Sequence, residues 1–253
     1  MFSKIAIGIK TFLRDEKLFT AIAGIESKLY DAKMIIADCG DISNRKEELY
    51  ASLIQRCHTV IYLPFDAGFG AMSNAIVDAL DRPYLLIGSD DFDFRPESVR
   101  IGIDKLQEVL DLTDIDIASG RVRGPYEFDL EDRGDTIIEH RVETNIDPVP
   151  WVIGCDLTVN YSLIRREVFS KVRWDDDIKI GGGEHGAFFV DVKRAGFKVG
   201  YVPGVEISEQ EGDDSLEYKS YRIRSLFTDR PCFDRRGIKK YVLGSGKVDY
   251  DVR

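Results

Sequence analysis

The sequence predicts an α/β protein in which helices cover a mostly parallel β-sheet, and three observations support this prediction. Short apolar runs alternate with segments whose apolar residues recur at helical spacing, an order that implies right-handed crossovers between parallel strands. Polar residues follow each of the first four apolar runs, at the sheet edge where such folds bind ligands. The chain has 253 residues, 43% of them hydrophobic, which is enough for a sizeable core.

The first half of the chain contains four predicted strands, each followed by a predicted helix. The first strand is the apolar run KIAIGIK, and the next segment places Leu18, Ile22, Ile25 and Leu29 on one face of a helix. We predict strands over residues 4–10, 32–39, 59–64 and 83–91. We predict helices over residues 16–30, 44–57, 71–80 and 96–110.

The second half departs from this alternation. Residues 114–124 are predicted to form one more strand, and residues 126–143 alternate apolar and polar residues about the turn DRGD, which indicates a β-hairpin. The segment AFFVDVKRAG predicts a helix over residues 187–196. We divide the chain into one domain, made of a first half and a second half, and a basic C-terminal segment, with bounds 1–120, 121–218 and 219–253.

Charge is distributed unevenly along the chain. The net charge of −10 disfavours binding to nucleic acid or to an anionic membrane. Residues 219–240, however, contain eight Lys and Arg against two acids. Two interpretations of this basic segment stay open: a site for an anion, and a solvated tail that balances an acidic body.

The cysteines and the apolar runs indicate a cytoplasmic protein. The four cysteines are scattered with no CxxC pair, which argues against a disulfide framework and a zinc ribbon and favours a reducing compartment. The first residues lack the apolar core of a signal peptide, and no run of about 18 apolar residues occurs. We therefore expect no stable membrane insertion.

The stretch GSDDFDF places three aspartates at the end of the fourth predicted strand. Carboxylates are the hard oxygen ligands that Mg²⁺ and Mn²⁺ prefer. Strand alternation would point Phe92 and Phe94 into the core and Asp93 away from them. An acidic surface turn is the alternative, but the position beside three other polar strand ends favours a cation site. We expect Asp91 to bind the cation first, with Asp90 as its helper and Asp93 facing solvent.

The stretch GGGEHGAFF supplies a candidate general base. Glu184 follows three glycines at or near a helix N-terminus, where a carboxylate is stabilised and can face a cleft. Its alternative role is to cap that helix. His185 could donate a hydrogen bond to a substrate phosphate, orient Glu184, or be structural. The three histidines show no HxH or HExxH spacing, so no zinc site is predicted.

Together these features resemble the GT-A glycosyltransferases, family-2-like enzymes in particular, over about residues 4–210. In the first half, ADCGD stands where the family has V-D-D-G-S, DAGFGAMSNAIVDAL where it has N-x-G-x-x-x-A-x-N, and LLIGSDDFDFRPES where it has D-x-D. In the second half, residues 158–207 resemble four stretches of β-1,4-N-acetylgalactosaminyltransferase-type proteins. These stretches are N-F-F-L-x-R, W-D-x-x-x-K, E-H-x-x-F-F and Y-x-P-D-V.

The resemblance implies a Rossmann-like GT-A fold and a metal-dependent, inverting glycosyltransferase that moves a sugar from a nucleotide-sugar, a UDP-sugar first, to a hydroxyl acceptor such as a glycan. Glu184 would be the catalytic base, and Mn²⁺ or Mg²⁺ the cofactor. Residues implied in nucleotide-sugar binding are Thr11, Arg14, Asp38, Gly68, Asn74, Asp90, Arg222 and Arg224. Residues implied at the acceptor are Trp174, Asp175, Gly182, Gly183 and His185. Residues implied in metal binding are Asp91, Asp93 and Glu209.

The chain departs from the family pattern in three places. Cys39 replaces the second acid of V-D-D-G-S, and Ser89 replaces the first acid of the D-x-D triplet. Ser208 or Glu209 stands where the family often has a metal-binding histidine, so Glu209 could substitute, the metal could keep an extra water, or catalysis could need less metal. Arg222 or Arg224 could compensate by binding the diphosphate bidentately.

Three other functions were weighed against this one. The acceptor could be a hydroxylated base in DNA, with residues 219–240 following the phosphates. The protein could instead bind nucleotide-sugars without catalysis, because its triplet is altered and the histidine is missing. A nucleotidyltransferase is not expected, because KTFLRDEK lacks the glycine-rich loop that such an enzyme needs after the first strand.

Overall fold

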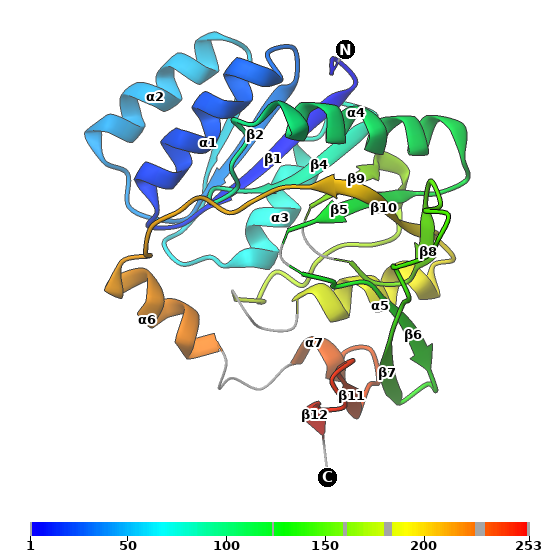
Figure 1. Ribbon diagram of the computed structural model, residues 1–253. Helices are drawn as coiled ribbons and strands as arrows, with labels where there is room; N and C mark the ends of the chain where they lie inside the picture. The colour runs from blue at the N-terminus through cyan, green and yellow to red at the C-terminus, as the bar shows by residue number, and fades with distance from the viewer. Residues whose placement is uncertain (1, 123, 159–160, 180–183, 226–230, 252–253) are drawn as a thin grey trace.

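A computed structural model describes residues 2–122, 124–158, 161–179, 184–225 and 231–251. Its centre is an eight-stranded sheet in the order β3-β2-β1-β4-β9-β5-β10-β8 (Figure 1). The strands of this sheet are β1 (Ile5–Thr11), β2 (Lys33–Asp38), β3 (Thr59–Tyr62), β4 (Tyr84–Ser89), β5 (Ile117–Arg121), β8 (Ile153–Cys155), β9 (Ser162–Arg165) and β10 (Val199–Glu206).

Helices cover both faces of the sheet, as predicted (Figure 1). Along the first half they are α1 (Asp15–Lys28), α2 (Asn44–Gln55), α3 (Phe69–Asp78) and α4 (Glu97–Leu112). One core joins α1, α2 and α4 to the sheet through residues such as Leu18, Tyr50 and Leu106. The other core joins α3 and α5 (Glu184–Arg194) to the opposite face. The predicted elements of the first half are confirmed, with ends that differ by a few residues.

The order of the strands in the sheet predicts where a ligand binds. β1 pairs in parallel with both β2 and β4. From β1 the chain first adds β2 and β3 on one side of the sheet and then adds β4 on the other side, so the strand order switches between β1 and β4. Ligands bind at such switch points, beyond the carboxyl ends of the strands. α3 lies close over β1 because Gly8 has no side chain: an added Cβ there would approach Ile76 Cγ2 to 2.7 Å.

The second half of the chain enters the same sheet. β9 is antiparallel to both β4 and β5 and lies between them, and β10 pairs in parallel with β5. The predicted hairpin is confirmed as β6 (Phe128–Asp132) and β7 (Thr136–Arg141). The predicted helix at 187–196 begins earlier, at Glu184, which confirms that this residue lies at a helix start.

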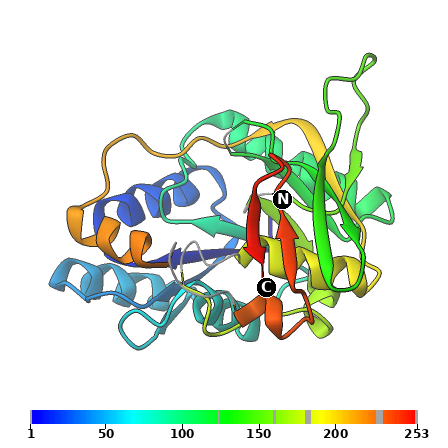
Figure 2. The same cartoon turned by 90° about the horizontal axis from the view of Figure 1, so that it is seen from below.

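The basic segment folds back onto the hairpin. After α6 (Leu216–Ser225) come α7 (Pro231–Asp234), β11 (Lys240–Val242) and β12 (Val248–Asp251). β11 pairs in parallel with β7, which gives a second sheet in the order β12-β11-β7-β6 (Figure 2). Cys232, Phe233 and Tyr241 are buried. A solvated tail therefore does not describe α7 and β11.

Candidate active site

A cavity of about 370 Å³ opens beyond the carboxyl ends of β1 and β4. Its volume is in the range of small-molecule sites. It brings together residues from both halves of the chain and from α6. The lining residues are Lys10, Thr11, Phe12, Arg14, Phe69, Met72, Ser89, Asp91, Phe92, Val122, Tyr126, Glu184, His185, Glu209, Tyr218 and Arg222.

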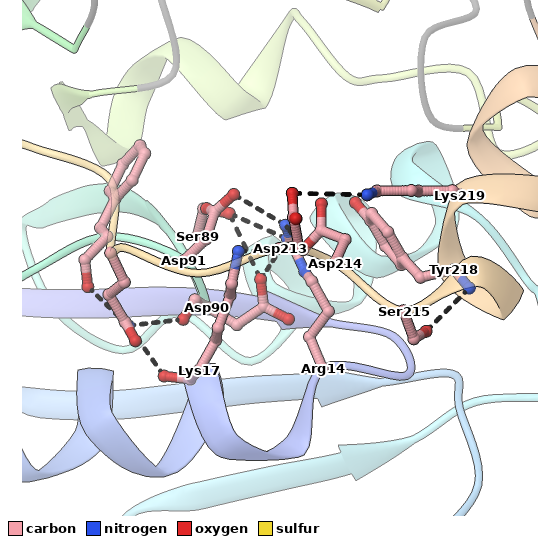
Figure 3. A network of polar contacts seen from close by, with 12 residues as sticks. Arg14, Lys17, Ser89, Asp90, Asp91, Asp213, Asp214, Ser215, Tyr218 and Lys219 are labelled. Carbon is pink, nitrogen blue, oxygen red and sulfur yellow. Dashed lines mark hydrogen bonds and ion pairs between the residues drawn. The ribbon is translucent and has the colours of Figure 1, made fainter.

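The acidic pair Asp90–Asp91 lies at the end of β4 and is bound by Arg14. Nη1 of Arg14 lies 2.7 Å from Oδ2 of Asp91, and Nη2 forms an ion pair with Asp90 (Figure 3). Burial raises the pKa of Asp90 to about 6, with Arg14 opposing and Asp91 adding to the shift. Burial also acts to raise the pKa of Asp91, but Arg14 and Ser89 outweigh it and the pKa is lowered.

The third aspartate of the triplet faces away from the cavity. Asp93 accepts hydrogen bonds from Arg95, whose side chain is largely exposed, and is absent from the cavity lining. Phe92 and Phe94 are both buried, as strand alternation predicts. The three aspartates therefore have different surroundings. Asp90 is buried, Asp91 lines the cavity, and Asp93 lies near the surface.

The segment after β10 closes over the acidic pair. Glu209 forms a β-bridge with Phe92 and lines the cavity with Asp91. The backbone N–H of Gln210 donates to the carbonyl of Asp91 at 2.6 Å, and its side-chain amide donates to the carbonyls of Lys17, Asp90 and Phe92. Gln210 therefore fixes Glu209 beside the aspartates.

Lys10 is a cavity residue that the sequence reasoning missed. It is buried at the end of β1, its Nζ donates to the carbonyl of Gly88 at 2.9 Å, and it lies over the Phe69 ring. Burial lowers the pKa of Lys10 to about 8, although Asp90, Asp91 and Glu184 oppose the shift. Its place at the end of the apolar run KIAIGIK, next to Thr11, was the signal that could have identified it.

Glu184 and His185 reach the cavity from the N-terminus of α5. Glu184 is 8% exposed. It lies near enough to Lys10 for its charge to oppose the lowering of the lysine pKa by burial. The His185 ring contacts Phe69 and Tyr126 edge-on. Burial lowers the pKa of His185, with Glu184 opposing the shift and Lys10 adding to it, which favours the neutral imidazole.

α6 forms the outer wall and adds two further residues. The guanidinium carbon of Arg14 lies over the Tyr218 ring, 4.5 Å from the ring centroid. Arg222 lines the cavity. Phe12 packs against Tyr218 and Tyr221 of α6 and against Phe65, which follows β3. Tyr218 and Tyr126 were not identified from the sequence, because only the tertiary fold brings α6 and the hairpin to this cavity.

Four described residues implied at the nucleotide-sugar lie outside the cavity lining: Asp90, which is fully buried, and three others. Asp38 is buried and accepts a hydrogen bond from Tyr50 at 2.6 Å while forming an ion pair with Lys46 at 3.0 Å. Gly68 precedes α3 with φ of 102°, a conformation that favours glycine. The Asn74 side chain bonds the backbone of Trp174, so it joins α3 to the segment before α5.

The residues implied at the acceptor are divided. His185 lines the cavity, whereas Trp174 is 7% exposed and stacks on Phe188 with ring centroids 4.1 Å apart. Asp175 forms ion pairs with Arg235 and Arg236. Gly182 and Gly183 lie outside the described residues, as does the side chain of Arg224.

Two arginines of the basic segment form ion pairs with carboxylates of the main body of the protein. Arg235 binds Asp175 and Asp177, and Arg236 binds Asp175 and Asp191. Among the described basic side chains of the segment, Arg222 lines the cavity. These pairings give no support to a phosphate-following strip, and hence none to a DNA acceptor.

The carboxylates at the end of β4 suit a divalent cation that is completed by other ligands. No group of three or more His, Cys, Asp or Glu side chains converges as a metal site within the described ranges. Asp91 and Glu209 nevertheless line the same cavity, and Mg²⁺ or Mn²⁺ commonly uses one or two carboxylates plus substrate phosphates and waters. The donor set therefore fits such a cation bound together with a diphosphate.

Two global observations bear on the setting of the site. The four cysteines are unpaired thiols. None of the helices in the described part of the chain is both long enough and apolar enough to cross a membrane.

Sequence comparison relates the chain to one group of enzymes. No protein-family model matches it. It is 31% identical over 213 residues to β-1,4 N-acetylgalactosaminyltransferase 2 of Mus musculus, covering 81% of this chain and 39% of the mouse protein. It is 26% identical over 200 residues to β-1,4 N-acetylgalactosaminyltransferase 1 of Homo sapiens, covering 74% of this chain and 35% of the human protein. The chain thus spans less than half the length of these curated relatives.

Solved structures share the fold at low sequence identity. The mannosyltransferase PcManGT from Pyrobaculum calidifontis, in complex with GDP-Man and Mn²⁺, superposes with a TM-score of 0.61 at 10% identity, covering 88% of this chain and 61% of that chain. Residues 1–349 of S. aureus TarS superpose with a TM-score of 0.58 at 10% identity, covering 92% of this chain and 69% of that chain. At such identities the likeness concerns the fold alone.

Proposed function

Because the chain is a homologue of the β-1,4 N-acetylgalactosaminyltransferases and has the GT-A fold, we propose that it transfers a sugar from a nucleotide-sugar to a hydroxyl group of a glycan. One observation carries this proposal: a single cavity is lined by cations and carboxylates from the ends of β1 and β4 and also by Glu184 from the start of α5. A diphosphate leaving group and a hydroxyl nucleophile need these two kinds of group.

The donor would bind along the wall made by β1, β4 and α6. Lys10, Arg14 and Arg222 are cations that could neutralise a diphosphate, and guanidinium groups bind phosphate oxygens in pairs. We propose a UDP-sugar as the donor. The names of the relatives make N-acetylgalactosamine the first sugar to test.

A divalent cation, Mn²⁺ or Mg²⁺, would be held by Asp91 and Glu209 together with donor oxygens and water. When bound, it would stabilise the negative charge of the departing diphosphate. Asp90 would act behind Asp91, because it is fully buried and reaches Arg14 but not the cavity surface.

Glu184 would act as the base. Its carboxylate would take the proton of the acceptor hydroxyl as the hydroxyl oxygen forms a bond to the anomeric carbon. The bond from that carbon to the diphosphate oxygen would break on the opposite side, which inverts the anomeric configuration. His185, whose pKa is lowered mainly by burial, could bond the donor or the acceptor beside Glu184.

A comparison of two glutamates tests this role. Glu184→Gln should lower kcat at least about 100-fold, the usual contribution of a general base, and leave donor binding nearly unchanged. Glu97→Gln is the matched control, because Glu97 is also the first residue of a helix but is exposed and absent from the cavity lining. Turnover with Mn²⁺ and a panel of UDP-, GDP- and CMP-sugars, including slow donor hydrolysis, is measured beside the donor-induced shift in Tm.

The same panel separates catalysis from binding alone. A Tm shift without turnover in the wild-type protein, and no effect of Glu184→Gln, would favour a nucleotide-sugar-binding protein over an enzyme. No shift with any of these sugars would count against both functions.

A further inference from the structure

The guanidinium of Arg14 binds the acidic pair Asp90–Asp91, and a divalent cation would need the Asp91 carboxylate of that pair. The guanidinium approaches Oδ2 of Asp91 to 2.7 Å with one nitrogen and binds Asp90 with the other (Figure 3). Asp90 is fully buried and the Asp91 side chain is 15% exposed. The two negative charges are thus already neutralised, in part, by a cation that belongs to the chain.

Arg14 is held by more than these two carboxylates. The Tyr218 ring lies 4.5 Å from the guanidinium carbon, and Asp214 lies 3.8 Å from Nη1. The four partners come from three segments: the loop after β4, α6, and the segment before α6. Arg14 therefore connects the donor wall of the cavity to the outer wall (Figure 3).

A divalent cation and this guanidinium compete for the same oxygens. If both bound the acidic pair at once, three positive charges would face two carboxylates at close range, and the like charges would repel strongly. A donor diphosphate removes the conflict, because its oxygens can accept the guanidinium bidentately while also binding the metal.

The geometry leaves room for the guanidinium to move. Arg14 belongs to the turn between β1 and α1, and its side chain makes no hydrogen bond that caps α1. It lines the main cavity and also a second cavity of about 520 Å³, on the side of Asp213 and Asp214. Lys17 already forms an ion pair with Asp214 at 2.9 Å. The Arg14 guanidinium would therefore bind less strongly on this side than at the acidic pair.

We propose that Arg14, bound to Asp90 and Asp91, keeps divalent metal off Asp91 until a nucleotide diphosphate binds and draws the guanidinium onto its phosphates. Metal and donor then bind together, and metal alone binds weakly. This inference rests on the function proposed above for its diphosphate, but the competition between Arg14 and the metal does not depend on turnover.

Mn²⁺ binding in the absence of any sugar tests the competition directly. Free Mn²⁺ is followed by its electron paramagnetic resonance signal during titration of the full chain, with and without UDP. The wild-type protein should bind Mn²⁺ weakly alone and at least tenfold more tightly with UDP. Arg14→Met should bind Mn²⁺ alone at least tenfold more tightly than the wild-type protein, and UDP should add much less to that affinity.

Two further variants control for charge and for folding. Lys17→Met removes one positive charge near Asp214 without touching the acidic pair, and should leave Mn²⁺ affinity within about twofold of wild type. Arg14→Lys keeps the charge but cannot bridge both carboxylates in the same way, so its Mn²⁺ affinity should lie between those of wild type and Arg14→Met. Circular dichroism establishes that each variant is folded.

Three results would overturn the inference. Tight Mn²⁺ binding by the wild-type protein without UDP would show that Arg14 is no barrier. Equal Mn²⁺ affinities of wild type, Arg14→Met and Arg14→Lys would show that Arg14 is only structural. Equal gains in Arg14→Met and Lys17→Met would assign the effect to net charge. If Arg14→Met binds Mn²⁺ tightly but no nucleotide changes the affinity in any variant, the competition stands and the proposed function fails.

Discussion

The burial of the Lys10 ammonium group lowers the stability of the folded protein when the group is charged. A pKa lowered from 10.5 to about 8 corresponds to roughly 3 kcal/mol against the charged form in the folded state. Burial is the cause, and three nearby carboxylates only partly compensate. Such an arrangement is common where a charge serves a ligand rather than the fold. Lys10 at the cavity wall fits that pattern.

The lowered pKa of Lys10 predicts a pH-dependent stability. Between pH 8 and 10.5 the unfolded state binds the proton more than the folded state does, so the free energy of unfolding rises with pH. From pH 7 to pH 10 the wild-type protein should gain roughly 2–3 kcal/mol of unfolding free energy relative to Lys10→Met, which lacks this titrating group. Urea denaturation at each pH measures it.

The control for this prediction is the exposed Lys4, which precedes the same strand. Lys4→Met should follow the wild-type pH profile. A constant difference between Lys10→Met and wild type over this range would contradict the lowered pKa.

Single residues also show what the sequence could predict about the site. Asp91 and Glu184 were identified because a strand end and a helix start place them, and local patterns predict both. The partners of Asp38 could not be predicted, since they depend on the complete burial of Lys46 and on the packing of Tyr50. The role of Arg14 between two carboxylates likewise depends on a loop and a strand 76 residues apart.

At the scale of elements, the N-terminus of α5 is fixed by β11. Gly186 lies against Tyr241, whose ring stacks on Phe233 with centroids 4.7 Å apart. The Tyr241 hydroxyl donates to the buried Glu139 at 2.9 Å, so the ring has no space to move. The C-terminal strand therefore helps to place the helix that carries Glu184.

Gly186→Ala tests this contact between elements. The added Cβ would lie 2.8 Å from the Tyr241 hydroxyl oxygen, which should cost about 1–3 kcal/mol of unfolding free energy and shift Glu184. Because small displacements of catalytic groups are costly, kcat should fall at least about tenfold while donor binding changes little. Denaturation and steady-state kinetics measure the two effects.

Gly154→Ala is the matched control, since an added Cβ at that glycine has no atom of the surrounding protein within 4 Å. A Gly186→Ala enzyme with wild-type stability and kcat would show that α5 is not held by Tyr241.

The elements that the sequence predicted are those with their own periodicity. The alternating strands and helices up to residue 112 carry enough residues for a pattern, and the hairpin has its turn signal. β9 and β11 have four and three residues and are strands only because a partner strand lies beside them. Their positions could not follow from local sequence.

For the molecule as a whole, the basic segment and the acidic body neutralise each other at one interface. Arg236 is 10% exposed and binds Asp175 and Asp191, whereas Arg235 is 44% exposed and binds Asp175 and Asp177. Buried pairs are costly to break, while exposed pairs contribute little. The attachment of α7 to the main body should depend mainly on Arg236.

This difference predicts unequal losses of stability. Arg236→Met should lower the free energy of unfolding by about 2–4 kcal/mol, and Arg235→Met by less than about 1 kcal/mol. Both variants lose one charge from neighbouring positions, so each is the other's control in urea denaturation. Similar losses would mean that burial does not distinguish the two arginines.

The insertion of β9 between β4 and β5 has a consequence for synthesis. The four parallel strands of the first half can assemble as soon as they leave the ribosome, but β4 then presents an unpaired edge until residues 162–165 arrive. β5 also waits, because both of its neighbours, β9 and β10, are made later. An open strand edge attracts other chains. The nascent protein thus passes through an interval in which its own later segments and foreign strands compete for the same edge.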